Sequence, residues 1–504
     1  MTTIYDLVCA APADASAIGA PDRASLTYGG LSDLLEQTAK TLNGFGIGRG
    51  DRVAIVLPNG PEMATAFLAV SACASAAPLN PAYKQDEFTF YLEDLGAKVL
   101  LVDAASASPA LKSAETLGIP VISIDWSDTD PAGSFGIKAI DLAGTPANTG
   151  WSEGADEALV LHTSGTTSRP KVVPLGTANV LASAKHIGTA LQLGSKDVGL
   201  SIMPLFHIHG LIASLLSSIH AGAHVVCTPG FNALKFFQWF SAVKPTWYTA
   251  VPTMHQAILS RAARNQDAVQ ASTLRFARSS SSSLPPPVMA ELEETFSCPV
   301  IEAYGMTEAS HQMASNPLPP EARKPGTVGK AAGPEIAIMS EAGDILAQGE
   351  SGEIVIRGPN VFSAYENNPK ANAEAFSHGW FRTGDLGFLD EGGYLTISGR
   401  LKEIINRGGE KIAPREVDDI LQAHPAIDQI VTFALPHDKL GEAVAAVVVF
   451  KEGQSAEISE LKAFASERLA AFKVPSTIII RDEIPKGATG KLQRIGLADK
   501  LGLT

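Results

Sequence analysis

The stretch ALVLHTSGTTSRPK, residues 158–171, joins a run of apolar residues to a loop of small and hydroxyl-bearing residues that ends on a lysine. This order predicts a buried strand that leads into a turn. Small residues let backbone N–H groups approach a phosphate closely, and Lys171 adds a mobile cation. The loop lacks the GxxxxGK[ST] pattern of P-loop nucleotidases. By itself it is therefore compatible with a phosphate site or with an ordinary turn.

Apolar, strand-like runs alternate with helical stretches on both sides of this loop. Such alternation is typical of parallel α/β layers, in which each strand leads into a helix that packs on the sheet. Ligand-binding loops then follow the carboxyl ends of the strands. The runs are RVAIVLP, AKVLLVD and PVISID before the loop, with a helix beginning at Pro61, and AHVVCTPG, PTWYTAVP, LRFARS and CPVIEAYG after it, with a helix over 285–296.

The pattern changes after Gly326, where short strands separated by glycine-rich turns predict an antiparallel, β-rich part that closes a large domain. Beyond Arg400, the runs IDQIVTFALP, EAVAAVVVF and STIIIRDEIP, with a helix over 458–472, predict a small α+β unit. The length of 504 residues also favours more than one packed unit. We therefore predict a large domain over residues 1–399 and a small domain over residues 400–504.

The composition, 45% hydrophobic and 18% charged residues, is typical of a folded globular protein. The net charge of -14, without blocks of like charge, argues against a nucleic-acid or membrane partner. No signal-like N-terminus and no apolar stretch of about 18 residues is present. We expect a cytoplasmic protein with reduced thiols and leave its oligomeric state open. Its scattered cysteines are Cys9, Cys73, Cys227 and Cys298.

Six further motifs follow in order along the chain. They are MPLFHIHG at 203–210, EAYGMTE at 302–308, WFRTGD at 380–385, GRLKEII at 399–405, RGGEKIAP at 407–414 and PKGATGKLQR at 485–494. Together with the loop, they resemble the signature of the ANL superfamily of adenylate-forming enzymes, which includes acyl-CoA synthetases, adenylation domains of peptide synthetases and beetle luciferases. The resemblance covers nearly the whole chain. The loop departs from the commonest family form at Ser168, where glycine is usual, and at Val172.

The resemblance implies a reaction in two halves. A carboxylate first attacks the α-phosphate of ATP and expels pyrophosphate, and a thiol, that of coenzyme A in the ligases, then attacks the acyl-adenylate and expels AMP. Mg²⁺ accompanies the ATP. Because no protein nucleophile is needed, catalysis consists of positioning and of neutralising charge on phosphoryl oxygens.

The resemblance assigns the nucleotide site to residues from several motifs. It implies that Tyr304 lies against adenine, Thr307 near the α-phosphate and Glu308 on Mg²⁺, for which a carboxylate is a suitable ligand. Asp385 would accept hydrogen bonds from the ribose hydroxyls. In isolation, Tyr304 could equally be a core residue and Asp385 a turn residue. The full set is Thr163, Ser164, Gly165, Thr166, Thr167, Lys171, Ser282, Glu302, Ala303, Tyr304, Gly305, Thr307, Asp385, Arg400 and Lys491.

Two lysines acquire roles only through their motifs, because either alone would read as a solvated surface lysine. The resemblance implies that Lys491 bridges the attacking carboxylate and the α-phosphate in the first half-reaction. It implies that Lys402 is the hinge about which a mobile small domain rotates between the halves.

The acid site is unusually polar for this superfamily. Where relatives often carry S-G-G-A-P-L, residues 279–284 read SSSSSL, and three histidines join them. Burying polar groups without partners costs about 1–3 kcal/mol each, so the acid should be small and polar. The serine run could instead be a flexible loop, two of the histidines core residues, and His207 a gate to the thiol tunnel. The predicted acid contacts are His207, His209, Ser280, Ser281, Ser282 and His311.

Within the superfamily the motifs most resemble the oxalate–CoA ligase subgroup, which makes oxalate the expected acid. The alternatives are malonate or another short-chain acid, a 4-coumarate-type acid, and a stand-alone domain that loads a carrier protein. Luciferase-like oxygenation and a non-catalytic nucleotide-binding module are further alternatives; the intact charged residues of the motifs argue against the latter. The residues expected at coenzyme A are Lys84, Gly408, Gly409, Phe472 and Lys473.

Overall fold

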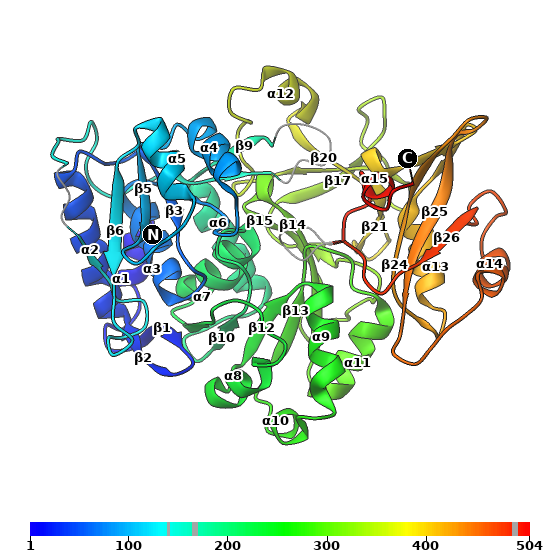
Figure 1. Cartoon of the computed structure of the whole chain (residues 1–504), viewed down its shortest axis with the longest axis horizontal. Coiled ribbons are helices and arrows are strands. Elements are labelled where there is room, and N and C mark those ends of the chain that lie inside the picture. The colour runs from blue at the N-terminus through cyan, green and yellow to red at the C-terminus, as the bar shows by residue number, and fades with distance from the viewer. Residues whose placement is uncertain (139–141, 164–169, 486–491, 504) are drawn as a thin grey trace.

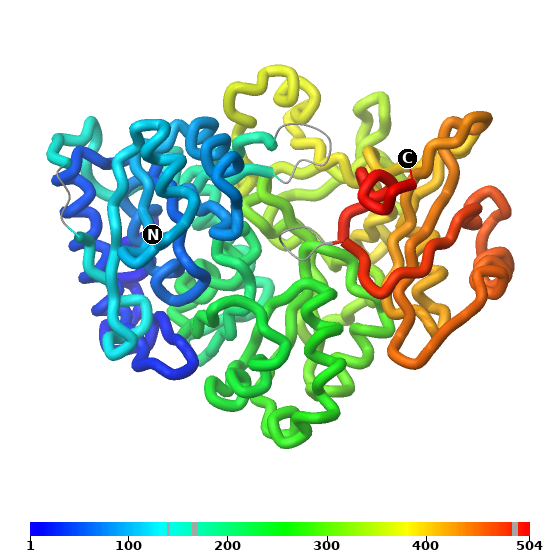
Figure 2. The backbone as a smooth tube through the Cα atoms, viewed as in Figure 1, coloured from blue at the N-terminus to red at the C-terminus, as the bar shows by residue number. Residues whose placement is uncertain are grey.

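The computed structural model describes residues 1–138, 142–163, 170–485 and 492–503. In the described part, three sheets build a large N-terminal domain and a fourth builds a small C-terminal domain. The chain runs from the blue helices and strands at the left of Figure 1, through the green centre, to the orange and red small domain at the right. The tube in Figure 2 shows the same progression, with the two domains side by side along the longest axis.

The first sheet has the order β7-β6-β5-β3-β4-β8-β9. Its central strands are parallel, as predicted, and the short end strands β7 and β9 pair antiparallel. Its central strands are almost uniformly buried because both faces are covered, whereas β6 and β7 at one edge are partly exposed. They are β3 (Arg52–Val56), β4 (Ser75–Pro78), β5 (Val99–Asp103), β6 (Val121–Asp125), β7 (Gly136–Ile137), β8 (Glu157–His162) and β9 (Val172–Gly176).

The second sheet has the order β16-β15-β14-β13-β12-β10-β11-β1-β2, with parallel pairing from β1 through β14. The N-terminal hairpin of β1 and β2 was not predicted; it adds an edge to this sheet although it lies far away in the sequence. The strands are β1 (Ser16–Ala20), β2 (Arg23–Thr27), β10 (Val198–Ser201), β11 (His224–Cys227), β12 (Trp247–Ala250), β13 (Phe276–Ser279), β14 (Val300–Met306), β15 (His311–Ser315) and β16 (Lys330–Ala331).

Two helices, α3 (Pro61–Cys73) and α6 (Thr177–Ala190), pack between these two sheets. Every residue of α3 is buried, because the helix contacts a sheet on each side. Helices α1 (Ile4–Cys9), α2 (Tyr28–Gly44) and α7 (Ser217–His220) join the same apolar core. On the outer faces, α4 (Gln85–Asp94) and α5 (Ala110–Leu117) pack on the first sheet, and α8 (Phe236–Val243), α9 (Pro252–Ala262), α10 (Gln266–Gln270) and α11 (Pro286–Phe296) on the second.

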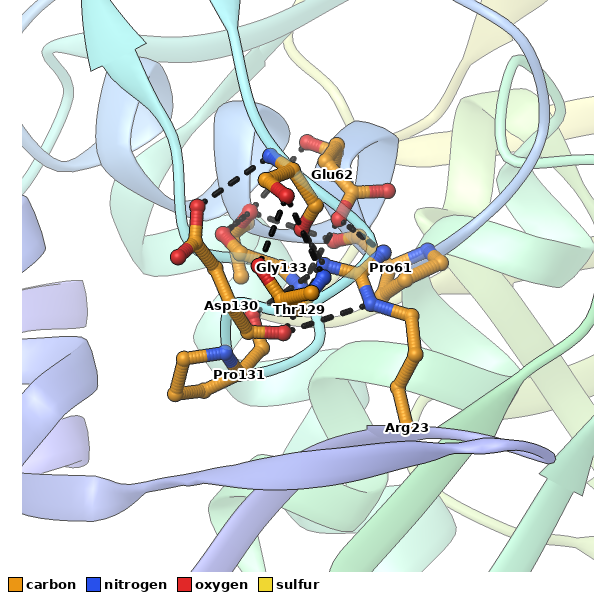
Figure 3. Close-up of polar contacts among 9 residues, drawn as sticks. Arg23, Pro61, Glu62, Thr129, Asp130, Pro131 and Gly133 are labelled. Carbon is orange, nitrogen blue, oxygen red and sulfur yellow. Dashed lines mark hydrogen bonds and ion pairs between the residues drawn. The ribbon is translucent and has the colours of Figure 1, made fainter.

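A buried ion pair fastens the two layers together. Figure 3 shows the Arg23 guanidinium, from the β1–β2 hairpin, reaching the carboxylate of Glu62 on α3. Their Nη1–Oε1 distance is 2.7 Å, and the same guanidinium donates to the carbonyl oxygens of Asp130 and Pro131. The Gly133 amide donates to the same Glu62 oxygen at 3.1 Å. The edge hairpin of one sheet is thereby tied to the loop that follows β6 of the other.

The third sheet is antiparallel, as predicted, and closes the large domain. It contains β17 (Glu335–Met339), β18 (Gly352–Arg357), β19 (Phe376–Ser377), β20 (Trp380–Leu389) and β21 (Leu395–Arg400), with α12 (Pro369–Ala375) beside it. A 3₁₀ turn, Leu401–Glu403, then leads into the small domain. The chain passes at this turn from the third sheet to the sheet of the small domain. The exact domain boundary between residues 399 and 400 stays a prediction.

The small domain has its own sheet and its own apolar core. The predicted helix over 458–472 is too long, because α14 ends at Ser466. The next residues turn so that Leu469 enters the core, and Pro475 disfavours a helical conformation just before it. The elements are β22 (Ile405–Arg407), β23 (Glu410–Ile412), α13 (Pro414–Gln422), β24 (Ile427–His437), β25 (Gly441–Phe450), α14 (Ile458–Ser466), β26 (Thr477–Ile480) and α15 (Leu497–Lys500).

Within the described ranges, no helix combines the length and the apolar character needed to cross a membrane. All four cysteines are free thiols, three of them buried.

Candidate active site

The predicted phosphate loop connects β8 to its antiparallel neighbour β9. The Thr163 amide donates to the Lys171 carbonyl at 2.9 Å, and the Lys171 amide donates to Thr163 Oγ1 at 3.3 Å. These bonds close the base of the loop and fix the position of Lys171. The other predicted loop residues, Ser164, Gly165, Thr166 and Thr167, and the departure at Ser168 lie outside the described residues.

Lys171 lies beside the predicted magnesium ligand. Its Nζ is 4.0 Å from the ring centroid of Tyr365, whose hydroxyl donates to Glu308 Oε1 at 2.8 Å. Burial lowers the pKa of Lys171, against the raising effect of the Glu308 charge, and the positive charge of Lys402 lowers it further. Burial raises the pKa of Glu308, against the lowering effect of the Tyr365 hydrogen bond. Sequence reasoning missed Tyr365, which lies in none of the recognised motifs.

A single buried carboxylate is consistent with a magnesium ion delivered by a nucleotide. Mg²⁺ bound with phosphates uses one or two protein carboxylates and completes its shell with phosphate oxygens and water. Glu308 supplies such a group, and the described residues contain no cluster of three or more acidic, histidine or cysteine side chains able to hold a metal by themselves. The residues present therefore fit an ion that arrives with ATP.

The predicted ribose and adenine residues come together through sheet pairing. The register of β20 and β21 places Asp385 opposite Arg400, whose Nε donates to Asp385 Oδ1 at 2.6 Å. The Tyr304 hydroxyl, from β14, donates to the other oxygen of the same carboxylate. Burial of Tyr304, together with the Asp385 charge, raises the pKa of its phenol. Because each carboxylate oxygen can accept more than one hydrogen bond, Asp385 can still receive a ribose hydroxyl.

The connection between β14 and β15 is sterically tight. A Cβ atom on Gly305 would lie 1.8 Å from the carbonyl oxygen of His311, so only glycine fits there. Thr307 begins a 3₁₀ turn, Thr307–Ala309, that includes Glu308. The two residues after this turn, Ser310 and His311, adopt positive φ angles of 48° and 96°. Such backbone strain in residues other than glycine is concentrated at functional sites.

Glu302 supports the serine-rich loop with its side chain. Its Oε1 accepts a hydrogen bond from the Leu284 amide at 2.9 Å, and its Oε2 has no hydrogen-bond partner among the described residues. Burial raises the pKa of Glu302 to about 7. Next to it, Ser280 Oγ donates to the Ala303 carbonyl at 2.9 Å, while Ser282 is exposed and bonds only its neighbour's carbonyl. This contact joins the loop to the strand that carries Tyr304.

Three of the predicted acid contacts do meet. His209 is the first residue of a π-helical segment, His209–Leu216, and its Nδ1 lies 3.0 Å from Ser281 Oγ. Its ring is 5.0 Å from that of His311. Ser281 has a positive φ of 76°, which turns its side chain toward His209. His207 lies alongside, with Nδ1 accepting from the His209 amide at 3.3 Å.

An arginine that the sequence did not single out completes this cluster. Arg278, on β13, is fully buried, and its Nη1 lies 3.4 Å from His209 Nε2 and 3.3 Å from Thr249 Oγ1. Its Nη2 donates to Gln312 Oε1 at 3.2 Å. The available signal was weak: an arginine within the otherwise apolar strand LRFARS, directly before the serine run.

The residues expected at coenzyme A are not brought together in this arrangement. Gly408 and Gly409 form the β22–β23 turn with φ angles of 63° and 98°. Lys473 pairs with Glu416 at 2.6 Å, and Phe472 packs on the core of the small domain. Lys84 precedes α4, which Figure 1 shows on the far side of the molecule from that domain.

The predicted catalytic lysine, Lys491, lies outside the described residues.

Comparison with known proteins follows the division of the chain. The model of the family described as "AMP-binding enzyme" matches residues 6–366, and that of the "AMP-binding enzyme C-terminal domain" matches residues 416–491. The chain therefore belongs to the AMP-binding enzyme family, and the predicted superfamily is confirmed.

Its relatives are similar over nearly their whole length. The oxalate–CoA ligase of Arabidopsis thaliana is 46% identical over 486 residues, which cover 95% of this chain and 94% of the relative. That of Saccharomyces cerevisiae is 42% identical, with 90% and 87% covered. The crystal structure of ATP-bound MatB from Rhodopseudomonas palustris superposes with a TM-score of 0.87 at 27% identity, with 98% and 97% covered. This likeness confirms the predicted α/β fold with its large and small domains.

Proposed function

We propose that this chain is an ATP-dependent, AMP-forming acid–CoA ligase and that its acid is oxalate. Membership of the AMP-binding enzyme family and the identity to two ligases named for oxalate support the activity. The observation that carries the choice of acid is the polar cluster formed by the buried His209 and Arg278 with the half-buried Ser281. A fatty or aromatic acid would leave the Arg278 charge without a counter-charge, whereas a small acid with a carboxylate at each end would supply one.

The nucleotide is held by groups from both ends of the large domain. Lys171 would face the triphosphate, and Glu308 would hold a Mg²⁺ ion, which would screen the charge of the phosphate oxygens. Asp385, ordered by Tyr304 and Arg400, accepts the ribose hydroxyls. The loop residues Thr163 to Thr167 and the Thr307 hydroxyl supply donors to the phosphates.

The chemistry proceeds in two displacements. One oxygen of the acid attacks the α-phosphorus, the bond to pyrophosphate breaks, and the acyl-adenylate forms. The sulfur of coenzyme A then attacks the acyl carbon, loses its proton to solvent, and AMP leaves with the electron pair of the broken carbon–oxygen bond. Lys491 stabilises the first transition state. Lys402, at the turn between the two domains, allows the small domain to rotate, after which Gly408 and Gly409, with Lys84, Phe472 and Lys473, contact coenzyme A.

A pyrophosphate-release panel tests the acid. Purified protein, ATP, Mg²⁺ and coenzyme A are combined with oxalate, malonate, acetate, 4-coumarate or octanoate. We expect oxalate to give the highest kcat/KM; release with oxalate no greater than the blank would overturn the assignment, and malonate as the best acid would favour the runner-up. A product that forms without coenzyme A, on a carrier protein, would identify an adenylation domain instead.

Two further features belong to the proposal. The free thiols suit a reducing compartment, which supports a cytoplasmic location. Removal of Mg²⁺ by a chelator should abolish ATP–pyrophosphate exchange, and its return should restore it. Absence of exchange under all conditions would instead favour a non-catalytic nucleotide-binding module.

A further inference from the structure

Arg278 carries a positive charge that no carboxylate neutralises. Its guanidinium lies between β12, β13, β15 and the π-helical segment, fully removed from solvent. Its hydrogen-bond partners are the imidazole of His209, the hydroxyl of Thr249 and the amide of Gln312, none of which can carry a negative charge here, and its Nε has no partner among the described residues. No acidic side chain of the described part of the chain forms an ion pair with it.

This absence is unusual for the chain itself. Arg275, three residues earlier in the same segment, contacts both carboxylate oxygens of Asp197, at 2.8 and 3.0 Å. Arg52 likewise contacts Glu157, and the half-buried Arg23 contacts Glu62. Arginines with a purely architectural role are thus paired with carboxylates here, whereas the most deeply buried one is not.

Burial of an unpaired charge is expensive unless an anion compensates it. Burial lowers the pKa of Arg278 to about 9, so the guanidinium still carries its charge at neutral pH. Neutral partners satisfy hydrogen bonds but supply no opposite charge. The missing counter-charge must therefore come from outside the described chain, and a carboxylate matches the guanidinium fork best.

The position of Arg278 points to the end of the acid that does not react. The next residues form the serine loop, which Ser280 joins to the Ala303 carbonyl, beside Tyr304 of the nucleotide site. Arg278 and the proposed nucleotide contact Tyr304 are therefore joined by this short loop. The backbone of Arg278 is held in place by His255, whose Nε2 lies 3.2 Å from the Arg278 carbonyl.

The hydrogen-bond pattern also prepares Ser281. Nε2 of His209 lies 2.7 Å from Thr249 Oγ1, which can donate, and 3.4 Å from Arg278 Nη1, which can only donate. In the tautomer that fits both contacts, Nε2 accepts and Nδ1 carries the proton. That proton points at Ser281 Oγ, which leaves the Ser281 hydroxyl hydrogen available to an incoming acceptor. Gln312 is held in turn by the Ala332 carbonyl, so its Oε1 stays directed at Arg278.

We propose that Arg278 binds the distal carboxylate of the substrate and thereby selects small dicarboxylates over monocarboxylates of the same length. Ser281 donates to the same carboxylate, and Thr249 and Gln312 orient the guanidinium. This inference rests on the proposed acid–CoA ligase activity and assigns its specificity to one residue.

The test compares Arg278→Gln and Arg278→Lys with the wild-type enzyme, using Arg264→Gln, an exposed arginine of the same domain, as the control for loss of charge. The readouts are kcat/KM for oxalate and for acetate, thermal stabilisation by ATP, and Tm. We expect Arg278→Gln to lose roughly 100-fold in kcat/KM for oxalate, with stabilisation by ATP and activity on acetate within about threefold of wild type. Arg278→Lys keeps the charge but not the fork and should lose roughly 10-fold.

The outcomes separate this inference from the proposed function. If the wild-type enzyme turns over oxalate and Arg278→Gln keeps that kcat/KM within about threefold, the role of Arg278 is overturned but the proposed function stands. Wild-type preference for acetate over every dicarboxylate overturns both. If Arg278→Gln does not fold, the oxalate kcat/KM of Arg278→Lys decides: a loss confined to oxalate, with stabilisation by ATP unchanged, supports the role, and no loss overturns it. Should malonate prove the better acid, the same ratios are measured with malonate.

Discussion

Glu302 shows how a single ionisable residue can couple the stability of this protein to pH. Its carboxyl group is buried under the serine-rich loop and accepts one hydrogen bond, from the Leu284 amide. Burial raises its pKa from 4.5 to about 7, and the nearby charge of Arg415, on the small domain, opposes that shift. Since the side chain holds the loop that carries Ser281, its protonation state bears directly on the acid site.

Stability should therefore fall as the pH rises from about 4.5 to about 7. Over this range the unfolded chain releases the Glu302 proton while the folded chain retains it, so the free energy of unfolding decreases as the pH rises. Below pH 4.5 and above pH 7 the Glu302 carboxyl has the same protonation state in both forms, so it adds no pH dependence there. Glu302→Gln keeps the acceptor for Leu284 but removes this dependence. We expect its stability relative to wild type to improve by about 2 kcal/mol between pH 5 and pH 8.

Thermal unfolding at a series of pH values measures this difference. Glu291→Gln, exposed on α11, controls for the loss of one negative charge. A Glu302→Gln variant whose Tm follows the wild-type value in parallel from pH 5 to pH 8 would show that the Glu302 proton is not retained in the folded state.

At the scale of elements, the hairpin of β14 and β15 brings the nucleotide and acid sites within a few residues of each other. Tyr304 and Glu308 carry the proposed nucleotide contacts, whereas His311 and Gln312 contact His209 and Arg278 of the proposed acid site. The two strands can approach closely because Gly305 has no side chain against the His311 carbonyl. A register error here would displace both sites at once.

Gly305→Ala should accordingly damage both stability and catalysis. The added methyl group would meet backbone, which cannot move aside as a flexible side chain can, so we expect a loss of about 3 kcal/mol in unfolding free energy. ATP–pyrophosphate exchange should fall together with Tm. Gly44→Ala is the matched control, because a Cβ there would meet nothing within 4 Å. A Gly305→Ala enzyme as stable as this control would contradict the steric argument.

The sequence predicted those elements whose signal is local. The strand before the phosphate loop, α3 and the antiparallel strands follow from runs of apolar residues and turns within a few positions of each other. The β1–β2 hairpin could not be placed, since its partner β11 lies about two hundred residues away. The functional roles of Arg278 and Tyr365 could not be predicted for the same reason, because their partners Gln312 and Glu308 come close only in the folded chain.

At the scale of the whole molecule, the small domain rests on the acid-site loop through polar contacts that a rotation would break. Arg415, at the start of α13, donates to Ser283 Oγ at 2.6 Å. Within the small domain, Arg494 contacts Glu403, in the 3₁₀ turn, at 3.1 Å and Asp418 at 2.7 Å. The segment that follows Lys491 is thus tied to the predicted hinge, and a change at one should be transmitted to the other.

The two half-reactions should respond in opposite ways to substitutions of Lys491 and Lys402. Lys491→Ala removes the cation that we propose to stabilise the first transition state, so ATP–pyrophosphate exchange should be abolished while supplied acyl-adenylate is still converted to the thioester. Equal loss of both halves would contradict this assignment. The measurement requires both assays on the same preparation.

Lys402→Pro should have the converse effect. The 3₁₀ turn of Leu401–Glu403 requires φ values near those of proline at Lys402, so the substitution fixes φ at that position, although its ring also restricts the helical conformation of Leu401. Rotation about the turn would then be blocked, and conversion of acyl-adenylate to thioester should fall roughly 100-fold while exchange stays within about threefold. Lys402→Ala removes the charge but leaves the backbone free, so it should keep both activities. Normal thioester formation in Lys402→Pro would place the hinge elsewhere. Equal losses in the alanine and proline variants would mean that the positive charge of Lys402, which acts on nearby Lys171, matters more than its backbone freedom.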